Sequence, residues 1–275
     1  MAEHCIKYNT TNMKRMRFIA KAVFVLLGIA LLQAFAPADK RKPVLYIIGD
    51  STVRNSDGSG KNGQWGWGTV LHPFFDTARI SLQNHAIGGR SSRTFITEGR
   101  WEKISAMLKR GDYVIMQFGH NDGGPLDDTA RARGTIKGIG EEQKEIYNPI
   151  RKTNEVVHTY GWYMRKYVRE AKEKGATAIV CSPVPRNNWA NGKIRRANQD
   201  YGLWAKQVAE QEGAFFIDLN EMVATEYEKM DTAAVSKLFY GDHTHTSLEG
   251  ANLNAAQVAK GIQGMRKCKL RKYLK

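Results

Sequence analysis

Val44-Leu45-Tyr46-Ile47-Ile48-Gly49-Asp50-Ser51 is the stretch that decides the fold of this chain. An uninterrupted apolar run that ends at a glycine is typical of a strand buried on both faces of a parallel sheet. Polar residues follow Gly49 directly, so the next turn is expected at the carboxyl edge of that sheet. In open α/β folds this edge is where ligands bind.

The same pattern recurs along the chain. Further short apolar runs lie at 80–82, 113–118, 177–181 and 214–217. Amphipathic stretches separate these runs and predict helices over 69–75, 101–109, 154–174, 198–212, 219–229 and 247–261. Alternating strands and helices predict a three-layer α/β/α domain around a parallel sheet. Residues 119–140 are rich in Gly, Asp and Arg, and we expect them to form a long functional loop.

The N-terminal residues have the order of a secretory signal. Lys14, Arg15 and Arg17 precede an apolar run at 22–32, and the small-x-small site Ala34-Phe35-Ala36 follows. The run is about half of the ~20 residues that a membrane-spanning helix needs. We therefore predict a signal peptide over 1–36, cleavage near Ala36 and export to the periplasm or the medium, without stable membrane insertion. An uncleaved anchor is the alternative.

Residues 37–275 are expected to form a single domain with a basic C-terminal tail (Arg266, Lys267, Lys269, Arg271, Lys272 and Lys275). The whole chain has a formal charge of +15, and loss of residues 1–36, which hold five Lys or Arg and one Glu, would leave +11. Such a surface favours polyanions: nucleic acid, anionic lipid or an acidic polysaccharide. Cys181 is interpreted as a buried apolar residue, and its pairing with Cys268 stays open.

Polar residues that carry chemistry follow the predicted strands and precede the last helix. These blocks are Gly49-Asp50-Ser51-Thr52, Gly88-Gly89, Gly119-His120-Asn121-Asp122 and Gly241-Asp242-His243-Thr244-His245. An Asp three residues before a His can bind the imidazole Nδ1, which leaves Nε2 to accept a proton from a Ser hydroxyl. Ser51, His245 and Asp242 are therefore the candidate catalytic triad.

Two simpler interpretations compete with the triad. Ser51 in a turn is also a common helix-capping residue. His243 and His245 could chelate a metal, but a zinc site needs a third ligand, and the sequence shows no partner cluster. We therefore expect neither a metal nor an organic cofactor.

Taken together, the blocks resemble those of the SGNH (GDSL-type) hydrolase superfamily. Gly49-Asp50-Ser51 resembles its nucleophile block and Gly89 its glycine block; Gly119-x-Asn121-Asp122 resembles its asparagine block and Asp242-x-x-His245 its acid–base block. The blocks at 88–93, 118–124, 182–186 and 242–246 are similar to those of rhamnogalacturonan acetylesterases. The resemblance implies a flavodoxin-like fold with five parallel strands and the removal of acetyl groups from a pectin backbone.

The resemblance also implies roles for single residues. Ser51 would attack the acetyl carbonyl while His245 removes its proton and Asp242 supports the imidazolium. An oxyanion hole would consist of the amides of Ser51 and Gly89 and the side-chain amide of Asn121. For this role we prefer the backbone amide of Gly89 to that of Gly88.

The expected partner is an acetylated acidic polysaccharide rather than nucleic acid; the sequence leaves the oligomeric state open. Candidate substrate-binding residues are Arg90, Arg93, Arg186, Trp189 and, on the long loop, Arg131 or Arg133. Arg binds carboxylates and Trp stacks on sugar faces, although a solvated Arg and a buried Trp are the plain alternatives. Two other functions stay open: an esterase acting on acetylated xylan, lipid or short acyl esters, and a non-enzymatic polyanion-binding surface protein.

Overall fold

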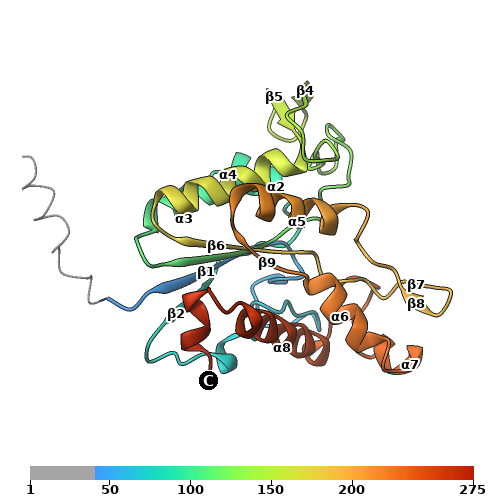
Figure 1. Cartoon of the computed structure of the whole chain (residues 1–275). Helices are drawn as coiled ribbons and strands as arrows, with labels where there is room; N and C mark the ends of the chain where they lie inside the picture. Colours follow the sequence, from blue (N-terminus) through green and yellow to red (C-terminus); the bar gives the residue numbers. More distant parts are fainter. Residues whose placement is uncertain (1–40) are drawn as a thin grey trace, which may run out of the picture. The chain divides into compact units, whose positions relative to one another are not determined.

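In the computed structural model, which describes residues 41–275, the central sheet has five parallel strands in the order β2-β1-β3-β6-β9 (Figure 1). Their bounds are β1 Val44–Gly49, β2 Ser81–Asn84, β3 Tyr113–Gln117, β6 Thr177–Cys181 and β9 Phe215–Ile217. Each strand lies at a predicted apolar run, because such runs can be buried on both faces only inside a covered sheet. The predicted three-layer α/β/α class is confirmed.

Helices cover both faces of the sheet. One layer contains α2 Ser92–Thr97, α3 Arg100–Met107, α4 Tyr160–Glu173 and α5 Tyr201–Glu212; the other contains α6 Leu219–Tyr227 and α8 Leu248–Gly264. The short helices α7 Thr232–Ser236, η1 His72–Phe74 and η2 Lys269–Tyr273 pack against the core on the α6 and α8 side.

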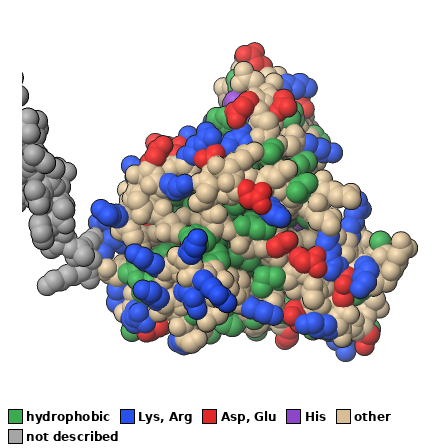
Figure 2. All heavy atoms as spheres, in the orientation of Figure 1, with side chains coloured by type: hydrophobic (Ala, Val, Ile, Leu, Met, Phe, Trp, Pro, Cys, Tyr) green, Lys and Arg blue, Asp and Glu red, His purple; other side chains and the backbone are tan. Residues whose placement is uncertain are grey.

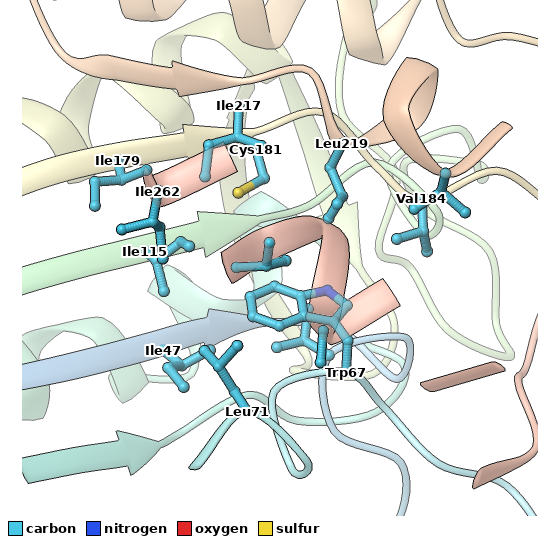
Figure 3. Packing of buried hydrophobic residues seen from close by; sticks show 14 of the residues in the cluster. Ile47, Trp67, Leu71, Ile115, Ile179, Cys181, Val184, Ile217, Leu219 and Ile262 are labelled. Atoms are coloured by element: carbon cyan, nitrogen blue, oxygen red, sulfur yellow. The ribbon is translucent and has the colours of Figure 1, made fainter. Parts of the chain in front are cut away.

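Alternate residues of β1 belong to different halves of the core, as expected where successive side chains point to opposite faces. Tyr46 and Ile48 pack with the α2–α5 layer, whereas Ile47 packs with the α6 and α8 layer. Figure 3 shows this second cluster, in which Ile47 and Ile115 of neighbouring strands lie on the side of Ile262 from α8.

The predicted helix over 154–174 is wrong in its first part. Residues 143–158 form an antiparallel hairpin, β4 Gln143–Asn148 and β5 Thr153–His158, and α4 begins only after it. The side chain of Thr159 caps α4 by accepting a hydrogen bond from the Trp162 amide. The β-branched residues Thr153 and Val156 favour a strand here. Val157, whose spacing from Tyr160 and Met164 fits a helix, is buried as part of β5.

Other segments differ less. The predicted helix over 69–75 is reduced to η1, which has Pro73 in its first turn. The helix α2 and the hairpin of β7 Trp189–Ala190 and β8 Lys193–Ile194 were not predicted. Residues 119–140 contain no helix and no named strand, which confirms the long loop. Cys181 and Cys268 are both buried and free.

The C-terminal segment is packed against the domain rather than extended, while most of its basic side chains are exposed. Leu270 is buried, the Lys275 amide donates to the carbonyl of Phe74, and Tyr273 contacts the ring of Tyr113 at the start of β3. Figure 2 shows Lys and Arg side chains gathered over this part of the surface. The predicted signal peptide lies outside the described residues. Within 41–275, no helix is long and apolar enough to cross a membrane.

Candidate active site

Ser51 lies in the turn that follows β1, at the carboxyl edge of the sheet. The carbonyl of Asp50 accepts the amide of Val53 at 3.1 Å and closes this turn. A side chain at Gly49 would place its Cβ 2.6 Å from the carbonyl oxygen of Gln117. The close approach of β1 and β3 therefore requires glycine directly before the turn.

A buried chain of hydrogen bonds fixes the direction of the turn. The carboxylate of Asp50 accepts the amide of Thr52 at 2.8 Å and its hydroxyl at 2.7 Å. The side chain of Gln117 donates to the same hydroxyl at 2.6 Å, and the indole of Trp67 donates to Gln117 at 2.9 Å. All four residues are buried. Trp67 is thus a buried structural residue.

Ser51, His245 and Asp242 form one hydrogen-bonded chain. Nδ1 of His245 lies 2.6 Å from Oδ2 of Asp242, and Nε2 lies 2.9 Å from Oγ of Ser51. An ionised carboxylate can only accept, so Nδ1 donates to Asp242 and Nε2 is left to accept the Ser51 hydroxyl. The structure brings the three predicted residues together in the geometry that a nucleophile, its base and the group that orients the base require.

Backbone pairing brings His245 to Ser51. The amide of Trp67 donates to the carbonyl of Thr52 at 3.0 Å, which ties the segment around residue 65 to the Ser51 turn. The amide of Trp65 donates to the carbonyl of Thr246, and the Thr246 hydroxyl donates to the carbonyl of Trp65, both at 2.8 Å. The residue after His245 is therefore anchored to the segment that packs against Ser51.

Asp242 is held in the ionised form. Burial alone would raise its pKa, but hydrogen bonds from the His245 ring and from the backbone amides of His245 and Thr244 outweigh burial and lower the pKa to about 2. A carboxylate that is charged at every working pH can fix the imidazole tautomer and stabilise the imidazolium.

The predicted oxyanion donors border the same turn. Within residues 41–275 the backbone amides of Ser51 and Gly89 donate no hydrogen bond, so both are available to a ligand. Asn121 donates one amide hydrogen to the carbonyl of Arg90 at 2.9 Å, which orients its side chain and leaves the second hydrogen free. The amide of Gly88 is equally unused, so the choice of Gly89 stays a prediction.

Asp122 joins the loops that carry Asn121 and Gly89. Its buried Oδ1 accepts the amide of Ser92 at 3.0 Å and the Ser92 hydroxyl at 2.5 Å, at the start of α2. Burial raises the pKa of Asp122 to about 7, although the Ser92 hydrogen bonds oppose this. The sequence showed Asp122 in a motif but not this role. The signal available in the sequence was its position in the polar block that follows the buried strand β3.

The proposed role of Arg93 in substrate binding is wrong. Its side chain is fully buried, and it forms two hydrogen bonds to the carboxylate of Glu155 on β5, at 2.7 and 2.9 Å. It also donates to the carbonyl of Gly134 at 2.8 Å. Arg93 lies on the inward side of α2, so its guanidinium holds the β4–β5 hairpin and the long loop against the domain.

The remaining candidates differ in their surroundings. Arg90 pairs with Glu98 at 3.0 Å. Trp189 is partly buried against the core, and its indole donates to Asn187 at 2.9 Å. Arg186 is half-buried, contacts the ring of His243 at 3.4 Å, and lines a cavity of about 290 Å³.

Arg133, which the sequence offered only as an alternative to Arg131, is half-buried and donates to the carbonyl of Gly89 at 3.0 Å. It therefore lies on the Gly89 side of the site, whereas Arg186 lies on the His243 side. In the part of the chain that the structure describes, no group of three or more His, Cys, Asp or Glu residues is placed to hold a metal ion.

Comparison with known proteins identifies the family. The sequence model of the GDSL-like Lipase/Acylhydrolase family matches residues 47–253, a span that contains Ser51 and His245. A rhamnogalacturonan acetylesterase of Emericella nidulans is 32% identical over 248 residues, 90% of this chain and 91% of that protein. A Bacillus subtilis protein named "Probable rhamnogalacturonan acetylesterase YesY" is 34% identical over 224 residues, 80% of this chain and 92% of that protein.

Among solved structures, the YxiM protein of Bacillus subtilis is similar with a TM-score of 0.66 and 26% sequence identity; the match covers 83% of this chain and 58% of that longer chain. The motifs, the fold and these similarities agree. The chain belongs to the GDSL-like lipase/acylhydrolase family, the SGNH hydrolases, and its class is that of the ester hydrolases, as the motifs predicted.

Proposed function

We propose that the protein removes acetyl groups from rhamnogalacturonan, an acidic pectic polysaccharide, through an acetyl-Ser51 intermediate. One observation carries the proposal: Ser51, His245 and Asp242 are hydrogen-bonded in series at the carboxyl edge of the sheet. The similarity to rhamnogalacturonan acetylesterases over most of the chain supports the choice of substrate.

The reaction follows from the geometry. Oγ of Ser51 attacks the acetyl carbonyl while Nε2 of His245 takes the hydroxyl proton. The tetrahedral intermediate collapses, and the imidazolium gives that proton to the leaving sugar oxygen. Water, deprotonated by the same Nε2, then attacks acetyl-Ser51, and the imidazolium returns the proton to Oγ of Ser51 as acetate leaves. Asp242 keeps Nδ1 protonated throughout and stabilises the positive ring in both steps.

The oxyanion is held by the amides of Ser51 and Gly89 and by the free amide hydrogen of Asn121. These donors are oriented before the substrate binds, because the carbonyl of Arg90 fixes Asn121 and the turn fixes Ser51. Loss of one such donor typically costs about 2.7–4 kcal/mol of transition-state stabilisation.

The charges around the site support an acidic substrate. Arg133 and Arg186 are half-buried on opposite sides of the site, and no carboxylate within residues 41–275 lies within 4 Å of either guanidinium. Desolvation, and then the neighbouring charge of Arg131, lower the pKa of Arg133. A half-buried cation without an anionic partner is costly, and a polymer that carries carboxylates would supply one.

The order of residues 1–36 supports export, to the periplasm or the medium, where a polymer too large to cross a membrane is available. The proposal includes neither nucleic acid nor stable membrane insertion. Mass spectrometry of the protein recovered outside the cytoplasm tests this point. A mature N-terminus near Pro37 is expected, and a full-length chain in the membrane fraction would contradict cleavage.

The decisive experiment measures acetate release from acetylated rhamnogalacturonan, beside acetylated xylan and 4-nitrophenyl acetate, with the protein and its Ser51→Ala variant. Release from the pectic polymer that is lost in the variant is the expected result. Release from xylan or the small ester alone would support the esterase activity but contradict pectin as the substrate. No release from any ester, with salt-sensitive polyanion binding, would favour the non-enzymatic alternative.

A further inference from the structure

A cavity of about 290 Å³ is lined in part by Gly119 and His120, the two residues before Asn121. The loops after β3 and β6, the segment that follows β8 and the start of α5 form its walls. The residues used in the following argument are Gly119, Arg186, Arg195, Arg196, Asp200 and Tyr201. Loops at the carboxyl ends of several strands thus meet here, which is the usual place of a ligand site in this class of fold.

Arg186, which lines the cavity, contacts the loop that carries Asp242 and His245. A guanidinium nitrogen of Arg186 lies 3.4 Å from Nε2 of His243, and the amide of Asn187 donates to the carbonyl of His243 at 2.8 Å. Arg186 also donates to the carbonyl of His120, the residue before Asn121, at 3.3 Å. A ligand in this cavity would therefore lie next to the loops that carry Asn121 and His245.

The arginines of the cavity are not balanced by carboxylates. Arg196 is neutralised, because it pairs with both Glu221 and Glu228. Arg186 and Arg195 have no such partner: among residues 41–275, no carboxylate lies within 4 Å of either guanidinium. The acidic residue of the lining, Asp200, is exposed and forms no ion pair with them. Two guanidinium groups are thus available to an anion.

One wall of the cavity is aromatic and rigid. Tyr201 is half-buried, and its ring contacts those of Tyr160 and Trp204 edge-on, with centroids 5.1 and 4.8 Å apart. A Cβ at Gly119 would lie 3.0 Å from the Cβ of Tyr201. The glycine of the asparagine block therefore leaves the room that Tyr201 occupies. Such a ring offers an apolar surface to the face of a sugar.

We propose that this cavity is a subsite for a uronate residue of the polymer, in which Arg186 and Arg195 bind the sugar carboxylate and Tyr201 packs on the sugar ring. Guanidinium groups suit this role because their fixed donors match the two oxygens of a carboxylate. The subsite deepens the proposed function and rests on it for the identity of the polymer, but binding of the uronate needs no turnover.

Calorimetry with the Ser51→Ala protein tests the subsite without hydrolysis. The ligands are unacetylated rhamnogalacturonan oligosaccharides and the same oligosaccharides with their carboxyl groups reduced to alcohols. We expect Arg186→Gln and Arg195→Gln, each added to Ser51→Ala, to weaken binding of the acidic ligand about tenfold or more, because each removes a charge-assisted hydrogen bond. Binding of the reduced ligand should be weak in the parent and unchanged in both variants.

Arg266→Gln is the matched control, because it removes the same charge from the exposed C-terminal segment outside the cavity lining. It should leave the affinity for the acidic ligand within about twofold of the parent, as a distant surface charge contributes little once salt screens it. Arg195→Lys keeps the positive charge but lacks the planar guanidinium. Its affinity for the acidic ligand should lie between those of the parent and Arg195→Gln. Thermal unfolding of every variant shows that each is folded.

The outcomes separate the two proposals. Selective loss of acidic-ligand binding in the two cavity variants supports the subsite. Equal losses for acidic and reduced ligands, or a loss in Arg266→Gln as large as in Arg195→Gln, would overturn it. If the cavity variants bind normally while the parent enzyme deacetylates rhamnogalacturonan, the proposed function stands and the subsite fails. If uronate binding depends on the two arginines but acetate is never released, the subsite stands and the proposed function fails.

Discussion

Nε2 of His245 lies 2.9 Å from Oγ of Ser51, although 194 positions separate the two residues in the chain. Two backbone hydrogen bonds, between Trp67 and Thr52 and between Trp65 and Thr246, hold the two loops in place for this contact. Neither residue is positioned by its own neighbours alone. The nucleophile and its base therefore exist as a unit only in the folded domain.

Ser51→Ala should lower kcat by about 10⁴-fold or more, and His245→Ala should have a similar effect, because each removes the nucleophile or its base. The double variant should be no slower than either single variant, since residues that act as one unit are not additive. Steady-state hydrolysis of 4-nitrophenyl acetate measures all three. Multiplied losses in the double variant would show that the two residues act independently.

Asp242→Asn should lower kcat by roughly 10²–10⁴-fold. The amide group can donate to Nδ1 and so favours the tautomer in which Nε2 cannot accept the Ser51 proton. The pKa of Asp242 is about 2, so its protonation should not produce an acid limb in the pH profile of kcat above about pH 3. Rates between pH 3 and 9 test both points. An acid limb that vanishes only in Asp242→Asn would assign that limb to Asp242 and contradict the expectation.

Asn121→Ala should lower kcat by about 10²–10³-fold with little change in KM, because its free amide hydrogen acts on the oxyanion rather than on the bound ester. Asn154→Ala, on the exposed face of the β4–β5 hairpin, is the matched control and should retain the parental rate. A change in KM alone would place Asn121 in ground-state binding instead.

Arg93→Met should destabilise the domain by about 3–5 kcal/mol, since it removes the buried partner of the Glu155 carboxylate and leaves only the exposed Arg151 at 3.7 Å and the Asn148 amide to balance it. The double variant Arg93→Met/Glu155→Met should be less destabilised than Arg93→Met, because it also removes the poorly paired carboxylate. Urea unfolding measures both free energies. Unchanged stability of Arg93→Met, with weaker polysaccharide binding, would restore the substrate-binding role that its burial contradicts.

Asp122 should make stability fall as the pH rises from about 4 to above 7. Burial raises its pKa in the folded protein to about 7, well above the ~3.9 of an unfolded chain. At a pH between these two pKa values, Asp122 is protonated in the folded state and ionised in the unfolded state. Its contribution to the free energy of unfolding is therefore present at low pH and lost as the pH rises through the folded pKa. The effect is at most about 4 kcal/mol.

Asp122→Asn keeps the acceptor for Ser92 and removes the ionisation, so its unfolding free energy should depend less on pH over this range. Chemical unfolding at a series of pH values compares the two proteins. Parallel pH dependences would show that Asp122 ionises in the folded state as it does in the unfolded chain.

The sequence predicted those features that local pattern encodes. The five strands are short apolar runs between turn residues, and a covered sheet is the arrangement that buries both of their faces. The spacing of Asp242 and His245 lets one turn join them, and Ser51 follows a buried strand directly. Each of these inferences needs only neighbours in the chain and the rule that parallel strands present their carboxyl ends at one edge.

The features that the sequence did not decide depend on distant partners. Arg93 was indistinguishable from a surface arginine, because Glu155 lies 62 positions away and reaches it only through the hairpin. The hairpin itself was hidden because Val157 satisfies both the helical and the strand period. In the same way, only tertiary structure places Arg186 and Arg195 in one cavity beside His243. Local periodicity reports which residues are buried, whereas the partner of a buried charge is decided by how the folded layers bring distant segments together.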